Sequence, residues 1–420
     1  MASANTPEVQ IVNDPFAAVR IPEYRNLMMG RFTFVMAMRM ITTVVSWWIY
    51  QITKDPLAIG MIGLAEVIPA LSLALYSGHR VDIKDKRRLI LQGVTGYLLA
   101  GITLFALSTR QAQDFLHIRH ITWFIYGVFF FTGILRSFVG PSFSAMLATI
   151  VPKNLLQNAT TWNQGTWLSA SVTGHAVGGF LIAFIGISNT LLVVCCIIFA
   201  SLIFLYQLKP KPPLQTNMEK RTWESVKEGL NFVFKTKALL AAMALDMFAV
   251  LFGGAVAMIP VFAKDILKIS PLAYGWLNAA TDIGAISVVV ILTLWPMKKA
   301  QGRKMLLAVA GFGCCIVLFG LSKWFLLSFS VMLLAGILDG VSVVVRGTVM
   351  QLLTPDHMRG RVSSVSSMFV TSSNELGQFE SGVMARTMGA IPSVVFGGFM
   401  TIAVVVTTWF KAPTLRKFEY

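Results

Sequence analysis

Charged side chains are scarce in this sequence of 420 residues. They make up 13% of the chain, whereas about 25% is usual for a soluble domain. Hydrophobic residues make up 55%, and the mean hydropathy is +0.70. So few charges could not keep so apolar a chain in water unless most of it lay in lipid. The composition therefore excludes a soluble enzyme and favours an integral membrane protein.

Acidic residues are scarcer than basic ones. The 19 Asp and Glu residues face 35 Lys and Arg residues, which gives a formal net charge of +16. An excess of this size can reflect nucleic-acid binding, contact with acidic lipid, an anionic substrate or membrane topology. The position of the basic residues along the chain has to distinguish these alternatives.

Cysteines and nucleotide-binding motifs are also lacking. The 4 cysteines form two adjacent pairs, Cys195–Cys196 and Cys314–Cys315, inside apolar runs. This spacing suits neither a metal site nor a disulfide framework. No Gly-x-x-x-x-Gly-Lys-Ser/Thr motif is present, which argues against ATP-driven activity. We therefore expect no enzyme, no metal and no cofactor.

Long apolar runs, in contrast, are abundant. A membrane-spanning helix needs about 20 mostly apolar residues. Twelve such runs occur, near 27–52, 56–77, 89–108, 120–147, 159–185, 188–208, 238–262, 271–296, 305–321, 324–350, 362–388 and 391–410. The sequence thus predicts an all-α membrane protein with five parts: a cytoplasmic N-terminal segment (1–26), a six-helix bundle (27–208), a linker (209–237), a second six-helix bundle (238–410) and a cytoplasmic tail (411–420).

The linker carries a helical pattern of its own. Trp223, Val226, Leu230 and Val233 recur at helical spacing, with polar residues between them. This pattern predicts an amphipathic helix over 222–235 that lies on the membrane surface.

The basic residues orient the chain. With both termini in the cytoplasm, 24 Lys and Arg fall on the cytoplasmic side, 7 on the opposite side and 4 inside spans. Basic residues flanking spans concentrate in the cytoplasm. Most of the net charge therefore reflects topology, and we expect no nucleic-acid partner.

The two sets of spans repeat each other. Pro56-Leu-Ala-Ile-Gly60 recurs 215 residues later as Pro271-Leu-Ala-Tyr-Gly275. Beyond the third span the offset is 203, which maps Gly133 onto Gly336, Gly174 onto Gly377, Gly179 onto Gly382 and Gly186 onto Gly389. Two parallel copies of a six-helix unit are typical of transporters, whose substrate site lies between the copies near the bilayer midplane.

Charged residues inside spans are costly, about 2.5–3.5 kcal/mol each at mid-bilayer, so each needs a reason. Ten occur: Arg31, Arg39, Glu66, Arg136, Asp246, Asp282, Asp339, Arg346, Glu375 and Glu380. Ion pairs between helices are one reading, and Asp339 and Arg346 share a helical face. Because the acids outnumber the arginines, we expect at least one acid to lack a full partner and to carry protons.

A first resemblance comes from the loop after the second span. Gly78, Asp82, Arg87 and Arg88 resemble the cytoplasmic signature of the major facilitator superfamily, Gly-x-x-x-Asp-Arg-x-x-Arg-Lys/Arg, with Ile83 in place of its first Arg. The resemblance implies a latch that holds one conformation. It also implies that spans 1, 4, 7 and 10 line the cavity, that spans 2, 5, 8 and 11 join the halves, and that spans 3, 6, 9 and 12 face lipid. The ten charges avoid that last group.

Further resemblances come from the fourth span and from the second set of spans. Arg136-x-x-x-Gly140-Pro141 is similar to a motif of proton-coupled drug antiporters. The segments 245–254, 339–346, 354–361, with Arg359 and Arg361, and 373–382 resemble the branch of the superfamily that contains the enterobactin exporter. This implies a bacterial inner-membrane permease that exports drug-like or siderophore-like molecules by proton antiport.

These patterns give the candidate residues. The candidates for proton coupling are Asp246, Glu66, Asp282, Asp339, Glu375 and Glu380, and those for substrate binding or charge switching are Arg39, Arg136, Arg346 and Asn374. The candidates for the cytoplasmic latch are Gly78, Asp82, Arg87, Arg88, Arg359 and Arg361. We expect a monomer whose partners are a small-molecule substrate, protons and membrane lipid. An uptake permease or facilitator, and a membrane sensor without transport, remain alternatives.

Overall fold

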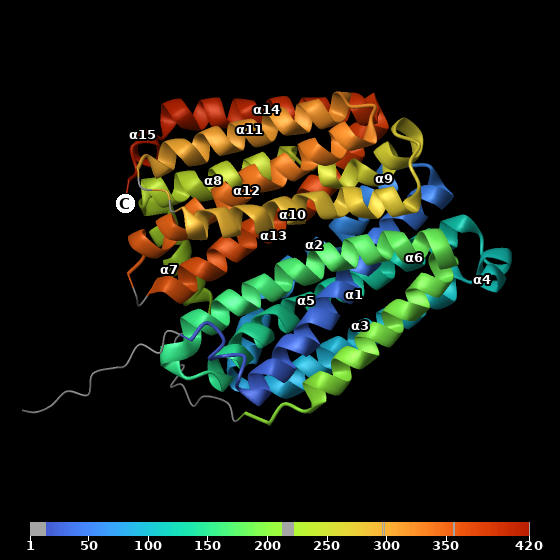
Figure 1. Ribbon diagram of the computed structural model, residues 1–420, viewed down its shortest axis with the longest axis horizontal. Helices are drawn as coiled ribbons and strands as arrows, with labels where there is room; N and C mark the ends of the chain where they lie inside the picture. Colours follow the sequence, from blue (N-terminus) through green and yellow to red (C-terminus); the bar gives the residue numbers. More distant parts are fainter. Residues whose placement is uncertain (1–13, 212–221, 296, 298, 356–357, 420) are drawn as a thin grey trace, which may run out of the picture.

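The structure, a computed structural model, describes residues 14–211, 222–295, 297, 299–355 and 358–419. It is a bundle of long, roughly parallel helices (Figure 1). The first group comprises α1 (Pro22–Thr53), α2 (Pro56–Ile83), α3 (Lys86–Ser108), α4 (Arg110–Phe115), α5 (Ile118–Ile150) and α6 (Leu156–Tyr206). The second comprises α7 (Thr222–Lys235), α8 (Lys237–Phe252), η2 (Ala255–Met258), α9 (Ile259–Val261), η3 (Phe262–Ile266), α10 (Pro271–Leu294), α11 (Gln301–Leu321), α12 (Phe325–Leu353), α13 (Arg359–Met388), α14 (Ala390–Lys411) and α15 (Pro413–Arg416).

The helices account for the predicted all-α architecture. In the described residues, ten are long and apolar enough to cross a membrane. One of these, α6, contains two spans, because Gly186 (φ 78°) interrupts it in the left-handed region that glycine readily adopts. The 30-residue α13 is long enough to cross as well, but it carries Asn374, Glu375 and Glu380. Gly389, the repeat counterpart of Gly186, ends α13 with φ 94°.

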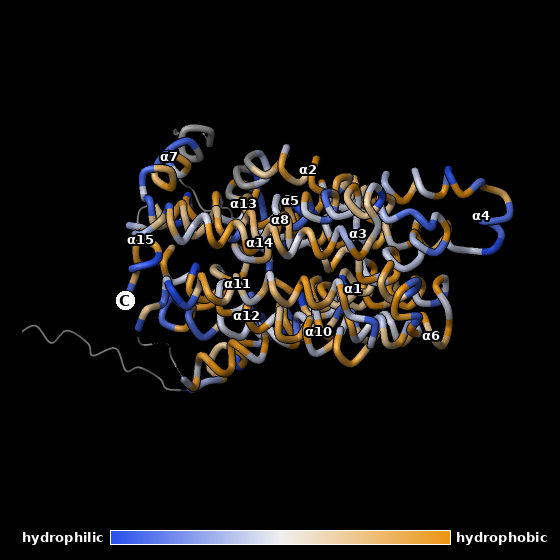
Figure 2. Tube along the Cα trace, turned by 90° about the horizontal axis from the view of Figure 1, so that it is seen from above, coloured by the Kyte–Doolittle hydropathy of each residue, from blue (hydrophilic) through white to orange (hydrophobic). Residues whose placement is uncertain are grey.

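The polar residues gather at the two ends of the bundle. Figure 2 shows hydrophilic segments at α4 on one end and at α7 and α15 on the other, with apolar helices between. We call the end with α7, α15 and the C-terminus the terminal end, and the opposite end, with α4 and α9, the far end (Figure 1). Residues 14–21 also lie at the terminal end, where the Ala18 amide donates to Asn158 near the start of α6.

The amphipathic helix of the linker forms as α7, but its apolar face meets protein. Val233 is fully buried and packs with Leu239, Val362 and Val365 of neighbouring helices. We expected this face to lie on lipid. Instead, the helices α8 and α13 cover this apolar face. The side chains of Trp223 and Val226, and linker residues 212–221, lie outside the described set.

The internal repeat appears as matching backbone contacts. Gly133 of α5 lies so close to α2 that a Cβ would come within 2.2 Å of the Glu66 carbonyl oxygen. At its counterpart Gly336 of α12, a Cβ would come within 2.1 Å of the Thr281 carbonyl oxygen of α10. Glu66 and Thr281 are themselves 215 residues apart. Both six-helix units therefore use the same close helix contacts.

The two units meet through pairs of equivalent glycines. Gly179 of α6 faces Gly275 of α10, where a Cβ on Gly179 would lie 2.5 Å from the Gly275 Cα atom. The repeat-related pair is Gly382 of α13 and Gly60 of α2, where the corresponding distance is 3.0 Å. Small residues let helix backbones approach closely in a membrane.

Further contacts close the far end. Tyr50 of α1 donates a hydrogen bond to Asp265 of η3. The Tyr274 hydroxyl donates to the Thr43 carbonyl at 3.1 Å, and Lys264 Nζ donates to Gln51 Oε1 at 3.1 Å. Toward the terminal end, in contrast, Gly140 of α5 and Gly347 of α12 have no described atom within 4 Å of a Cβ position. The described hydrogen bonds and glycine contacts between the units therefore lie toward the far end.

The contact of Gly179 on α6 with Gly275 on α10 can be tested by substitution. We expect Gly179→Ala to lower the thermal unfolding midpoint of the purified protein, because overpacking costs about 1–3 kcal/mol. The control is Gly165→Ala on the same helix, because no described atom lies within 4 Å of the Cβ position of Gly165. Alanine is the better helix former there by about 1 kcal/mol, so this midpoint should hold or rise. Equal midpoints for the two variants would contradict the assigned contact.

Candidate functional site

A cavity of about 300 Å³ lies mostly within the first six-helix unit. Residues of α1, α2, α3, α5 and α6 line it, and α13 adds Glu375 and Gln378. Its aromatic side chains are Phe34, Tyr97, Phe129, Phe143 and Trp167. Gly140 also lines the cavity, and no described atom lies within 4 Å of its Cβ position.

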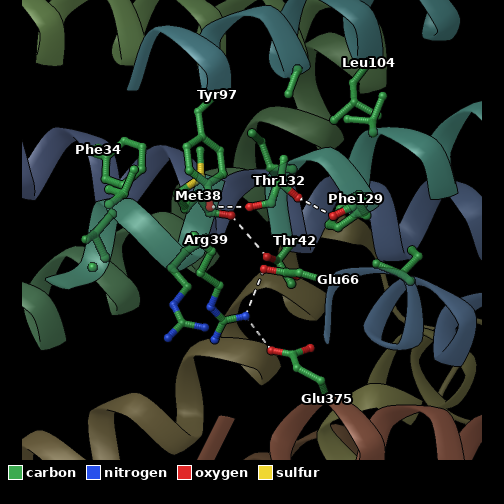
Figure 3. Close-up of a pocket in the computed structure, with 18 of the residues that line it drawn as sticks. Phe34, Met38, Arg39, Thr42, Glu66, Tyr97, Leu104, Phe129, Thr132 and Glu375 are labelled. Atoms are coloured by element: carbon green, nitrogen blue, oxygen red, sulfur yellow. Dashed lines mark hydrogen bonds and ion pairs between the residues drawn. The ribbon is translucent and has the colours of Figure 1, made fainter. Parts of the chain in front are cut away.

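A charged bridge crosses one wall of this cavity. Arg136 Nη1 of α5 donates to Glu66 Oε1 of α2 at 2.9 Å and to Glu375 Oε1 of α13 at 2.6 Å (Figure 3). Gln378 Nε2 donates to the other oxygen of Glu375 at 3.1 Å. The bridge thus joins the two units, and the Arg136 side chain keeps 41% of its surface accessible. Glu66, Arg136 and Glu375, three of the predicted residues, meet at one place.

A second polar cluster also spans the two units. Asp282 of α10 accepts a hydrogen bond of 2.5 Å from the Ser171 hydroxyl of α6. The same carboxylate oxygen lies 3.7 Å from His175 Nε2. On its other side, His175 Nδ1 is hydrogen-bonded to the Thr43 hydroxyl of α1 at 2.7 Å. The predicted Asp282 therefore lies between the units and is not among the residues that line the cavity.

The third cluster lies within the second unit. Arg346 of α12 forms an ion pair with Asp246 of α8, and both side chains are buried, at 11% and 7% exposure. We considered a local pair of Arg346 with Asp339 on the same helix. In the structure Arg346 pairs with Asp246 on a different helix, α8, and the two opposite charges neutralise each other there.

The remaining predicted residues lie apart from these clusters. In the described chain Asp339 has no hydrogen bond or ion pair, and Asn374 lies on the exposed side of α13, donating to the Val370 carbonyl at 3.0 Å. Glu380 accepts a bond of 3.4 Å from Ser381, and its Oε1 is buried without a described partner. Arg39 lines the cavity, with its guanidinium carbon 5.0 Å from the centre of the Trp167 ring.

The residues of the predicted latch lie at the terminal end. Gly78 and Asp82 belong to the last turns of α2, but their surroundings fall outside the described set. Arg87 Nη2 donates to the Tyr206 carbonyl at 2.7 Å, and Arg88 is exposed. Arg361 pairs with Glu228 of α7, and Arg359 is exposed at the start of α13.

Sequence reasoning missed part of the cavity lining. It expected α3 to face lipid, and Leu99 and Ile102 do point outward, at 57% and 46% exposure. Tyr97 and Leu104 of the same helix, however, line the cavity. Trp167 was also not selected. Tyr97, Leu104 and Trp167 carry no charge, so nothing in the sequence distinguishes them from the other residues of an apolar span.

Comparison with known proteins identifies the family to which this architecture belongs. The profile described as "Major Facilitator Superfamily" matches residues 27–378. The chain belongs to the major facilitator superfamily. It is a multi-pass membrane protein with the fold and family of transporters.

Similar curated proteins include two exporters. The multidrug efflux pump Tap of Mycolicibacterium fortuitum is 22% identical over 355 residues, covering 82% of this chain and 84% of the relative. The enterobactin exporter EntS of Shigella flexneri is 23% identical over 401 residues, covering 95% and 93%.

Similar solved structures agree on the fold. A D-xylose-proton symporter superposes with a TM-score of 0.73 at 12% identity, over 96% of this chain and 99% of that one. A POT family transporter in complex with 5-aminolevulinic acid gives 0.73 at 11% identity, over 94% and 96%.

The Arg136 bridge leads to a stability prediction. Arg136→Gln leaves two largely buried carboxylates without their cation; breaking a fully buried pair costs about 3–5 kcal/mol, and the cost here is smaller because the Arg136 side chain is 41% exposed. We expect a marked fall in the thermal unfolding midpoint, partly reversed by adding Glu375→Gln. Arg386→Gln is the control, because Arg386 is 59% exposed and pairs with Asp55 at 3.4 Å. Equal midpoints for Arg136→Gln and Arg386→Gln would refute the bridge.

Proposed function

We propose that this protein is a secondary active transporter that exports a small amphipathic molecule across the bacterial inner membrane by proton antiport and alternating access. The observation that carries the proposal is the bridge of Glu66, Arg136 and Glu375, which joins the two units at the wall of the cavity. A charge that holds two moving bodies together can couple their movement to its own protonation.

The shape of the molecule supports loading from the terminal side. The far end is held by Tyr50 with Asp265 and by the glycine pairs, whereas Gly140 and Gly347, toward the terminal end, have no described atom within 4 Å of a Cβ position. The distribution of Lys and Arg favours the cytoplasm for the terminal end. In this conformation the cavity receives its substrate from the cytoplasm.

Glu375 is our proposed proton carrier. Its carboxylate belongs to the second unit and its partner Arg136 to the first, so the contact must break when the far end opens. A proton on Glu375 removes the charge that Arg136 holds across the interface. Loss of that proton to the cytoplasm restores the bridge and the cavity that the next substrate enters.

The other predicted residues take secondary roles in this proposal. Glu66 keeps Arg136 in place. Asp282 acts with His175 between the units, and Asp246 with Arg346 within the second unit. Asp339, Glu380 and Asn374 remain further candidates. Gly78, Asp82, Arg87, Arg88, Arg359 and Arg361 form the proposed cytoplasmic latch.

The named relatives support export. Both curated relatives carry an outward direction in their names, multidrug efflux pump and enterobactin exporter. The D-xylose-proton symporter has the same fold, so an uptake permease or facilitator is the second candidate. A membrane sensor without transport is a third, and it would need no energy coupling.

Inverted membrane vesicles separate these candidates. We expect vesicles acidified inside to accumulate 2,3-dihydroxybenzoate, a siderophore-like probe, or tetraphenylphosphonium, a drug-like probe, and to lose the accumulated probe when the gradient is collapsed. Accumulation only in right-side-out vesicles with acid outside would favour uptake. No gradient-driven movement of either probe would count against the exporter.

Removing the proposed carrier should uncouple transport. We expect Glu375→Gln to lower acid-driven accumulation at least tenfold, because glutamine cannot exchange a proton, while probe exchange without a gradient continues. Asp114→Asn on the exposed α4 is the control and should behave as the wild type. If Asp246→Asn abolishes acid-driven accumulation and Glu375→Gln does not, Asp246 is the carrier instead.

Secretion by living cells identifies the substrate. A strain lacking this protein should retain a metabolite that the wild type secretes, and its culture medium can be compared with and without iron limitation. A defect confined to low iron supports a siderophore. Increased drug sensitivity with no effect of iron would reject the siderophore in favour of a drug-like substrate.

A further inference from the structure

Two cavity arginines form no ion pair with the described residues. Arg31 and Arg39 lie eight residues apart on α1, about 12 Å along the helix, and both line the cavity. Arg31 Nη1 donates to the neutral Asn163 at 2.7 Å. Within the described part of the chain, neither arginine forms an ion pair, and each lies over an aromatic ring.

The acids of the cavity are already engaged. Glu66 and Glu375 are the carboxylates among its lining residues, and both contact Arg136. Three arginines and two glutamates therefore line the cavity, which leaves it with an excess of one positive charge. Lipid cannot solvate this charge, and isolated charges in a membrane usually mark a substrate or ion pathway.

The internal repeat provides a comparison within the same molecule. Arg31 corresponds to Asp246, 215 residues later, and Phe143 to Arg346, 203 residues later. In the second unit these positions form the buried ion pair of Asp246 with Arg346. In the first unit Arg31 lies over the Phe143 ring, 5.6 Å from its centre. The position that holds a countercharge in one unit holds an aromatic ring in the other.

We propose that Arg31 and Arg39 bind the anionic group of the transported molecule, and that this molecule is an aromatic anion. A carboxylate or acidic phenol supplies the missing charge, and a guanidinium binds a carboxylate through two parallel hydrogen bonds. The rings of Phe34, Tyr97, Phe129, Phe143 and Trp167 surround the remaining space and suit a flat apolar body. The inference rests on the proposed function in taking this cavity as the transport site.

The charge preference can be measured by binding alone. The probes are 2-naphthoate, its neutral isostere 2-naphthamide and the cation (2-naphthylmethyl)ammonium, added to purified full-length protein in detergent at neutral pH without a gradient. By equilibrium dialysis, we expect naphthoate to bind at least tenfold more tightly than either of the others. Arg31→Gln and Arg39→Gln should each weaken naphthoate binding about tenfold and leave naphthamide binding unchanged.

Matched variants separate charge from folding. Arg416 lies 5.5 Å from the centre of the Trp409 ring, outside the cavity, so Arg416→Gln removes a similar stacked arginine and should bind like the wild type. Arg31→Lys and Arg39→Lys keep the charge and should bind naphthoate more tightly than the Gln variants. They also decide the question if a Gln variant does not fold.

Two results would overturn the inference. One is a wild type that binds naphthamide or the cation as tightly as naphthoate. The other is unchanged naphthoate binding in folded Arg31 and Arg39 variants. Failure here leaves export intact if vesicles still accumulate tetraphenylphosphonium. A wild type that prefers naphthoate but shows no acid-driven accumulation would keep the anion site and reject proton antiport.

Discussion

The contact of Arg136 with two glutamates places a guanidinium and two largely buried carboxylates at the wall of a cavity inside the helix bundle. Each charge there is acceptable only while the others stay beside it. Because Glu66 and Glu375 come from different units, this requirement also fixes where the units meet. The glycine pairs toward the far end allow the close approach, and the cavity lies beside the contact.

The two units share a backbone but not a chemistry. Gly133 and Gly336 make the same close contact with neighbouring carbonyls, since helix spacing depends on the absence of a side chain. At other equivalent positions the charges are opposite: Arg31 against Asp246, and Arg136 against Asp339. Duplication thus preserved the packing, while substitution at a few positions left one unit with a positively charged cavity and the other with an internal ion pair.

Much of the fold could be predicted because hydropathy and small residues act locally. The break of α6 at Gly186 and the polar character of α13 follow from the sequence. The expected lipid face of α3 was only half right, since Tyr97 turns into the cavity. The surface of α7 that was expected to lie on lipid packs on protein through Val233. An apolar side chain looks the same in a sequence whether lipid, protein or a cavity covers it.

The sequence by itself indicated a membrane protein built from two copies of a six-helix unit, and it predicted which charges lie inside the spans. Only the tertiary structure decided which of those charges meet. Arg346 pairs with Asp246 on another helix and not with Asp339 on its own helix. Arg136 binds Glu66 and Glu375, which lie 70 and 239 residues away in the sequence. Insertion into lipid depends on the composition of one span, whereas neutralising a charge depends on which side chains other helices bring within hydrogen-bond distance.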